Sequence, residues 1–398
     1  MWSPKSESDI RSAIANETLA ESSTFDCKQE TGGTDGARKE TARDLASFAV
    51  DGGQLLIGVA EDKANRTWHL HPIELAGQGE KINQIAQLRV DPPLNVVARD
   101  IPSQADPRYG YLLVEIPPSP QAPHMVEGVY FARGDRTKRR LSDAEVLRLH
   151  AARRAQSERA QQLLNALMER DPVPIADQVT GHLYMIAEPV LERAESAIDL
   201  VRGDVSVLRA IIEKVEGTLH IPWRQATPNP YSASHPVVRS SGRAFSSLVD
   251  GNLPSDDNGD EQSLTDIEFL ESGAVHVISG GFRRGDRIVD TIAVIYAQRL
   301  VGWVAAIADA TGYRGAWTFG LAGTNLAGAR SSRGLDNAAF ADSLPKFDRD
   351  AYESSTTAHL TEVQETPWVI VSALTARLCR GLGTAADFSR AFEPPSSE

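Results

Sequence analysis

The sequence has 398 residues, of which 41% are hydrophobic, and its formal net charge is −13. This length and composition predict a buried core and two or three domains, and the acidic balance argues against a general nucleic-acid coat protein. No uninterrupted apolar run is long enough to span a membrane: the best candidate, residues 288–308, contains Asp290, Gln298 and Arg299 and is expected to be a buried helix.

Charge and cysteine content separate the two halves of the chain and suggest a compartment. Residues 1–155 contain 20 Lys and Arg against 22 Asp and Glu, whereas the remainder contains 21 against 32. A nearly neutral N-terminal region can still present a basic face, and the acidic remainder is not expected to be the main nucleic-acid surface. With only Cys27 and Cys379, and no signal-peptide pattern at the N-terminus, we expect a cytoplasmic protein with no disulfide framework and no membrane partner.

Apolar spacing predicts a compact α/β unit over residues 1–155. It begins with an amphipathic helix at 3–22, for which Ser8 is a suitable cap. Residues 54–60 form a nearly continuous apolar run, which is typical of a strand buried on both faces. Further helices are predicted at 37–50, 80–87 and 142–169, and further strands at 25–29, 95–100, 109–116 and 129–132.

The segment Asp171-Pro172-Val173-Pro174 marks a boundary. We therefore expect a helical connector at 156–171 and an α+β accessory domain at 172–398, with a sensor or partner-binding role assigned by analogy alone. Helices are predicted at 186–201, 205–215, 288–308 and 368–382, a hairpin from 267–270 and 275–279, a disordered acidic loop at 250–263, and core positions at Trp303, Trp317 and Phe319.

Four carboxylates of the first domain are candidates for metal binding. Glu21 and Asp26 flank the passage into the first strand, and Glu61 and Asp62 follow the buried run 54–60. Carboxylates gathered at strand ends bind hard divalent cations such as Mg²⁺ or Mn²⁺, and Lys28 beside them could hold a phosphate. The competing interpretation is that these are solvated strand-end residues or caps.

A basic run follows the last predicted strand of the first domain. Its cations would supply affinity for a nucleic-acid backbone without sequence specificity, although such a run is also typical of an ordinary solvated turn. The cations are Arg133, Arg136, Lys138, Arg139 and Arg140.

Four stretches, in the same order over about 130 residues, resemble the signature elements of the Schlafen/AlbA_2 family, an α/β domain. The resemblance implies an α/β AlbA_2 fold for the first domain. The stretches are Glu21-Ser22 through Asp26 and Lys28; Ala46-Ser47-Phe48-Ala49 with Gly52-Gly53; Leu56-Ile57-Gly58-Val59 with Glu61-Asp62; and Tyr130 to Asp135.

The nuclease members of that family use three acidic residues in a metal-dependent endoribonuclease acting on tRNA or rRNA. Carried over position by position, the resemblance implies Glu21, Asp26 and either Glu61 or Asp62 as catalytic, metal-binding residues. Counting from Gly58 gives Glu61, and one extra residue in the turn would give Asp62. RNA is then a more natural substrate than DNA.

Two other functions stay open from the sequence. One is a non-catalytic nucleic-acid-binding regulator in transcription or defence, with a purely structural acidic cluster. The other is an ATP-binding sensor, after an older label for the family, although residues 32–39 lack the Gly-Lys-Ser/Thr ending of a phosphate-binding loop.

His69 and His71 have no further zinc ligands nearby in sequence. A homodimer that forms a two-sided cradle is a further hypothesis, for which the sequence shows no interface.

Overall fold

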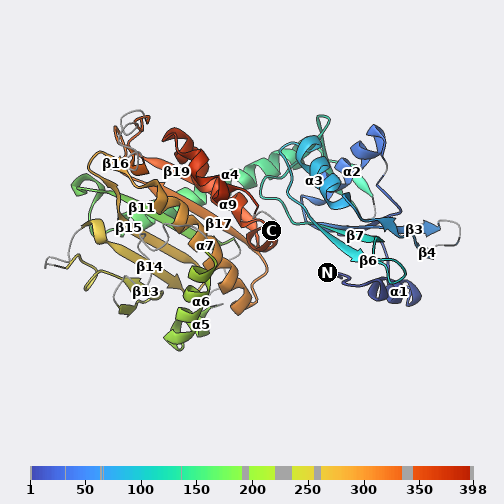
Figure 1. The fold of residues 1–398 in the computed structure, drawn as a ribbon, viewed down its shortest axis with the longest axis horizontal. Coiled ribbons are helices and arrows are strands. Elements are labelled where there is room, and N and C mark those ends of the chain that lie inside the picture. The colour runs from blue at the N-terminus through green and yellow to red at the C-terminus, as the bar shows by residue number, and fades with distance from the viewer. Residues whose placement is uncertain are drawn as a thin grey trace. The chain divides into compact units, whose positions relative to one another are not determined.

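The computed structural model describes residues 2–31, 33–62, 65, 67–135, 137–190, 197–219, 235–254, 261–333 and 344–394. These residues form two compact units, Met1–Arg154 and Ala155–Glu398, which we call the N-terminal and C-terminal domains (Figure 1). The long helix α4 (Asp143–Glu169) begins in the first unit and ends in the second.

The N-terminal domain is built on a mixed five-stranded sheet. Its strand order is β1-β2-β7-β5, with β6 also paired to β7; β1 and β2 are parallel and the other pairs are antiparallel. Two smaller sheets are the hairpin β3-β4 and the three strands β10-β9-β8. The strands are β1 (Phe25–Lys28), β2 (Gly53–Ile57), β3 (Val59–Asp62), β4 (Thr67–Leu70), β5 (Ile73–Glu74), β6 (Val97–Pro102), β7 (Tyr109–Ile116), β8 (Met125–Val126), β9 (Val129–Arg133) and β10 (Lys138–Arg140).

Helices cover both faces of this sheet. On one face, Leu55, Ile57 and Leu112 pack with residues of α2 (Asp35–Phe48) and α3 (Gln78–Arg89). On the other, alternate residues of the same strands, such as Leu56 and Leu113, pack with α1 (Glu7–Ala15). Because successive strand residues point to opposite faces, burial on both sides requires the near-continuous apolar runs seen in β2 and β7.

The N-terminal elements follow the sequence prediction, with local corrections. The helices and strands expected at 25–29, 37–50, 80–87, 95–100, 109–116 and 129–132 are confirmed to within a few residues. The first helix is shorter than predicted and is capped by Ser6, in a capping box with Asp9, rather than by Ser8. The run 54–60 is broken at Gly58, whose φ of 104° is left-handed, so Glu61 and Asp62 lie within β3.

The C-terminal domain contains a nine-stranded sheet with the order β12-β13-β14-β15-β11-β17-β19, extended by β16 and β18. Its strands are β11 (Gly181–Pro189), β12 (His235–Val238), β13 (Gly242–Ser246), β14 (Thr265–Leu270), β15 (Val275–Arg284), β16 (Arg287–Ile288), β17 (Ala316–Gly323), β18 (Arg330–Ser331) and β19 (Tyr352–His359). Its α-helices are α5 (Ile198–Arg202), α6 (Val205–Thr218), α7 (Asp290–Thr311), α8 (Leu360–Glu365), α9 (Pro367–Gly381) and α10 (Ser389–Phe392).

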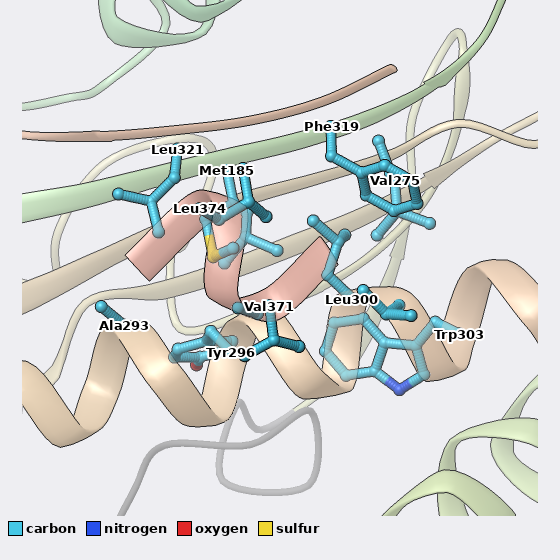
Figure 2. Close-up of a cluster of buried hydrophobic side chains, with 14 of the residues drawn as sticks. Met185, Val275, Ala293, Tyr296, Leu300, Trp303, Phe319, Leu321, Val371 and Leu374 are labelled. Atoms are coloured by element: carbon cyan, nitrogen blue, oxygen red, sulfur yellow. The ribbon is translucent and has the colours of Figure 1, made fainter. Parts of the chain in front are cut away.

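The central strand β11 carries the packing of this domain on both of its faces. Leu183, Met185 and Ala187 belong to the large core shared with α6, α7 and α9, part of which is drawn in Figure 2. The intervening Tyr184 and Ile186 pack in a smaller cluster with the C-terminal end of α4. A strand covered on both faces has no polar alternation.

Helix α7 is the core helix of the C-terminal domain. Its length and composition would suffice to cross a membrane, but 72% of its most apolar window is buried inside the structure. In Figure 2 the side chains of Ala293, Tyr296, Leu300 and Trp303 project from it into the cluster. This agrees with the prediction of a buried helix at 288–308.

The other C-terminal predictions divide into confirmed and wrong ones. The hairpin and the helices near 205–215 and 368–382 are confirmed, and Trp303, Trp317 and Phe319 are buried core residues. The helix predicted at 186–201 is wrong: its first residues end β11, residues 191–196 lie outside the described part of the chain, and only α5 is helical. Of the predicted acidic loop, residues 255–260 are likewise outside the description, and Glu261–Ser263 form a short 3₁₀ helix.

A buried polar cluster connects the end of α4 to β11 and this short helix. His182 is fully buried, and its Nδ1 and Nε2 lie 2.7 and 3.0 Å from carboxylate oxygens of Asp171 and Glu261. Tyr184 donates to the same Asp171 oxygen over 2.7 Å. Both ring nitrogens of His182 thus lie within hydrogen-bonding distance of a carboxylate. Each carboxylate therefore depends on its partners for compensation.

Replacing His182 by Ala should destabilise the C-terminal domain strongly, because buried Asp171 and Glu261, whose side chain is only 12% exposed, would lose a common partner. We expect the free energy of unfolding to fall by about 3–5 kcal/mol, measured by urea unfolding of the full chain with tryptophan fluorescence, to which buried Trp303 and Trp317 contribute. The control Val179→Ala alters a residue that is 88% exposed and should change the value by less than about 0.5 kcal/mol. A loss of unfolding free energy below about 1 kcal/mol in His182→Ala would show that His182 does not stabilise this polar cluster.

Candidate carboxylate site

Strand alternation decides which way the polar residues of β1 point. Phe25 and Cys27 pack in the core beneath α1, so Asp26 and Lys28 lie on the opposite face of the strand, toward α2. Both contact residues that reach this face from other elements, namely Arg133 and Asp44. Burial, reinforced by the charge of Asp26, raises the pKa of the Cys27 thiol, which makes it a structural residue rather than a reactive thiolate.

One face of α2, which we call the α2 stripe, contacts cationic side chains from three strands. Glu40, Asp44 and Phe48 are spaced four residues apart and therefore share one face of the helix. Buried Asp44 binds Lys28 Nζ at 2.5 Å and Lys138 Nζ at 2.8 Å, and Glu40 also pairs with Lys138. Burial lowers the pKa of Lys28, but the charge and hydrogen bond of Asp44 outweigh it, so the pKa is raised and the side chain stays protonated.

Arg133, at the end of β9, lies between Asp26 and Phe48. Its Nη1 donates to Asp26 Oδ2 over 3.1 Å, and its guanidinium carbon lies 4.5 Å from the centre of the Phe48 ring. Only 4% of its side chain is exposed. Arg133 is also the cross-strand partner of Lys138, which explains why both cations face α2.

Three carboxylates interact at the edge of this arrangement. Glu21 is half-buried, and its pKa is raised to about 7 by burial, by a hydrogen bond with Asp26 and by the charges of Asp26 and Glu61, while Arg133 opposes the shift. Glu61 lies on the exposed side of β3. Asp62 instead accepts hydrogen bonds from Asn65 in the following turn, over 3.3 Å from the backbone N–H and 2.8 Å from the side chain. Of the two alternatives for the third carboxylate, Glu61 therefore interacts with Glu21.

The donor chemistry of this trio fits a hard divalent cation, because oxygen ligands of like charge repel one another until a cation lies between them. Within the described residues, however, no group of three or more His, Cys, Asp and Glu stands close enough together to hold a metal ion. Asp26 is at present compensated by Arg133. Metal binding by Glu21, Asp26 and Glu61 thus stays a prediction.

The basic run is divided between the interior and the surface. Arg133 and Lys138 face α2, and the alternation of β9 turns Arg133 into the interior; its contact with a nucleic-acid backbone stays a prediction. Arg139 is exposed and pairs with Glu145 over 2.7 Å, and Arg140 is exposed. Arg136 lies outside the described residues. Residues 138–140, for which a solvated turn was the competing interpretation, form β10 and pair with β9.

Comparison with known proteins assigns the N-terminal region. Residues 21–142 match the family model described as Schlafen, AlbA_2. The N-terminal domain is a Schlafen AlbA_2 domain. This membership indicates a function connected with nucleic acids. The matched range contains all of the carboxylates, the α2 stripe and the basic run.

Other comparisons add little to the AlbA_2 assignment. No match is found among curated proteins. The crystal structure of the DIP2311 protein from Corynebacterium diphtheriae is 21% identical, covering 34% of this chain and 30% of its own, with a TM-score of 0.25. This chain thus spans less than a third of that structure, and the likeness carries no argument about fold or function.

The sequence names the carboxylates that interact here, whose role as a site stays a prediction, but it does not point to the residues that bind the neighbouring cations. Glu40, Asp44 and Phe48 were absent from the candidates, although their four-residue spacing on a predicted helix was readable. What the sequence could not supply was the partner of that stripe. Lys138 is 94 residues from Asp44 and 98 from Glu40.

The raised pKa of Glu21 predicts a pH-dependent effect on stability. Because the folded pKa of about 7 exceeds the ordinary value of 4.5, the native state gives up stability as pH rises from about 4.5 to about 7. Glu21→Gln cannot ionise and should gain about 1 kcal/mol over wild type between pH 4 and 8, once the shift is discounted for solvent screening. Chemical unfolding across this range measures the difference.

The matched control for this measurement is Glu74→Gln, because Glu74 is exposed on β5. Its stability difference from wild type should be flat across the same pH range. A Glu21→Gln difference that is equally flat, or that falls with pH, would show that the carboxylates do not repel one another as described.

Proposed function

We propose that the AlbA_2 domain is a divalent-metal-dependent endonuclease that cuts structured RNA of the tRNA kind. The observation that carries this proposal is the gathering of Glu21, Asp26 and Glu61: half-buried Glu21 is hydrogen-bonded to Asp26, and burial, this bond and the charges of Asp26 and Glu61 raise its pKa to about 7. Mutually repelling carboxylates are costly to a fold, and they are typical of sites that bind a cation. Glu21, Asp26 and Glu61 would hold Mg²⁺ or Mn²⁺.

The chain's own residues have separate tasks in such a reaction. When bound, a divalent ion supplies electrostatic stabilisation for the charge that develops on a phosphoryl group. Lys28, kept protonated and fixed by Asp44, places a positive charge beside Asp26. Exposed Arg139 and Arg140 on β10 would contact the RNA backbone, since the other described cations of the run are held by α2.

A second candidate is a nucleic-acid-binding regulator without catalysis. It is favoured by the ion pair between Asp26 and Arg133, which gives one member of the trio a structural role. This function predicts salt-sensitive binding that chelators do not change, and no cleaved product.

Cleavage assays separate these two functions. We expect the full chain to cut total tRNA in Mn²⁺ or Mg²⁺ but not in EDTA, and Glu21→Gln to lower the rate about 100-fold or more while RNA binding persists. Gel analysis of labelled tRNA beside a short duplex DNA measures both cleavage and substrate preference. Glu74→Gln, which alters an exposed carboxylate on β5, serves as the control with unchanged activity.

Each outcome of this assay has a distinct meaning. Full activity of Glu21→Gln would remove the carboxylate trio as the active site. Binding of tRNA by wild type, without product in any metal, would replace the nuclease with the regulator. Cleavage of DNA in preference to tRNA would keep the site and change the substrate.

A further inference from the structure

The guanidinium of Arg133 is buried with part of its hydrogen-bonding capacity unused. Its Nη1 contacts Asp26, but within the described residues no acceptor is within hydrogen-bonding reach of Nε or Nη2. Buried charged donors without acceptors cost free energy, and native structures keep few of them. Each such group calls for a functional or structural reason.

The two unused donors form one recognition edge. Nε and Nη2 lie on the same side of a guanidinium and direct two nearly parallel N–H bonds outward, which matches two oxygens of a phosphate or a carboxylate. The third nitrogen, Nη1, is held by Asp26, and the ring of Phe48 packs against the flat face of the guanidinium. Arg133 is therefore held in a set orientation, and its bidentate edge has no hydrogen-bond partner among the described residues.

We propose that this edge of Arg133 is the oxyanion subsite of the carboxylate site and binds a phosphate group of the RNA backbone. The inference rests on the proposed function for the choice of phosphate. In that arrangement one guanidinium joins the substrate to Asp26, so that the scissile phosphate and the metal-binding carboxylates have a common positioning residue. Arg133 thereby acts at the site and not as a surface contact.

The surroundings of Arg133 suit an anion that arrives with a cation. Glu21, Asp26 and Glu61 alone would repel a phosphate, and Arg133 and Lys28 offset only part of that charge. A divalent ion would neutralise the negative charge that remains. Nε and Nη2 are closed to solvent, and half-buried Glu21 is a neighbour whose pKa the Arg133 charge lowers, against the larger effects that raise it.

The test is calorimetric titration of the full chain with inorganic phosphate in the presence of Mg²⁺. We expect saturable binding that Arg133→Lys weakens about tenfold or more, because Lys keeps the charge beside Asp26 but cannot offer two parallel N–H bonds. Arg108→Gln, at an exposed arginine of the same domain paired with Asp106, is the matched control and should bind as wild type does. Acetate in place of phosphate tests for a carboxylate ligand.

Several results would overturn the inference. These are no phosphate binding by wild type, equal binding by Arg133→Lys, a loss in Arg108→Gln as large as that in Arg133→Lys, or acetate binding as tight as phosphate. If Arg133→Lys does not fold, the Nε–H resonance of Arg133 in wild type replaces it: its NMR signal should shift as phosphate saturates the protein. An unmoved signal at saturation would equally reject the subsite.

These results are distinguishable from failure of the proposed function. If no metal supports RNA cleavage but phosphate still binds at Arg133, the nuclease proposal fails and the subsite stands. If wild type cuts RNA and Arg133→Lys binds phosphate unchanged, the nuclease stands and the subsite is wrong.

Discussion

The placement of one guanidinium, between the ring of Phe48 and the carboxylate of Asp26, organises the functional end of the N-terminal domain. Arg133 comes from β9, Asp26 from β1 and Phe48 from α2, so a single side chain connects three elements. A buried charge is tolerated only with such compensation, and removing one partner leaves the other uncompensated. Lys28 and Lys138 are compensated in the same way by Asp44, which lies four residues before Phe48 on α2.

The sequence predicted the residue types of this site better than their directions. Glu21, Asp26 and Glu61 follow from motif positions, because family signatures preserve the order of residues along the chain. The basic run was harder to interpret, since five cations in eight residues resemble an exposed turn. In the structure β10 pairs with β9, and that register turns Lys138 inward and leaves Arg139 outside. Which cation is buried depends on this pairing, and hydrophobic periodicity does not encode it for a strand of three charged residues.

The wrong helix at 186–201 has a related physical cause. β11 is covered by the α7 core on one face and by the end of α4 on the other, so its residues are apolar without alternation. A short run of this kind fits a buried strand and a buried helix equally well from periodicity alone. The partners that decide the matter, β15 and β17, lie far along the chain. Elements with local signals, such as the hairpin of β14 and β15, were correctly predicted.

The two domains differ in how completely the buried charges of their described residues are satisfied. In the C-terminal domain both ring nitrogens of His182 meet carboxylates, and Asp171 has further donors. Among the described residues of that domain, the buried side-chain groups that lack hydrogen bonds are neutral, such as the indole N–H of Trp303 and Trp317. Arg133 instead leaves two charged donors unused beside carboxylates that repel one another. Buried charged donors without acceptors and carboxylates that repel one another lower the stability of a fold. Such groups are concentrated at sites where a ligand supplies the missing partner.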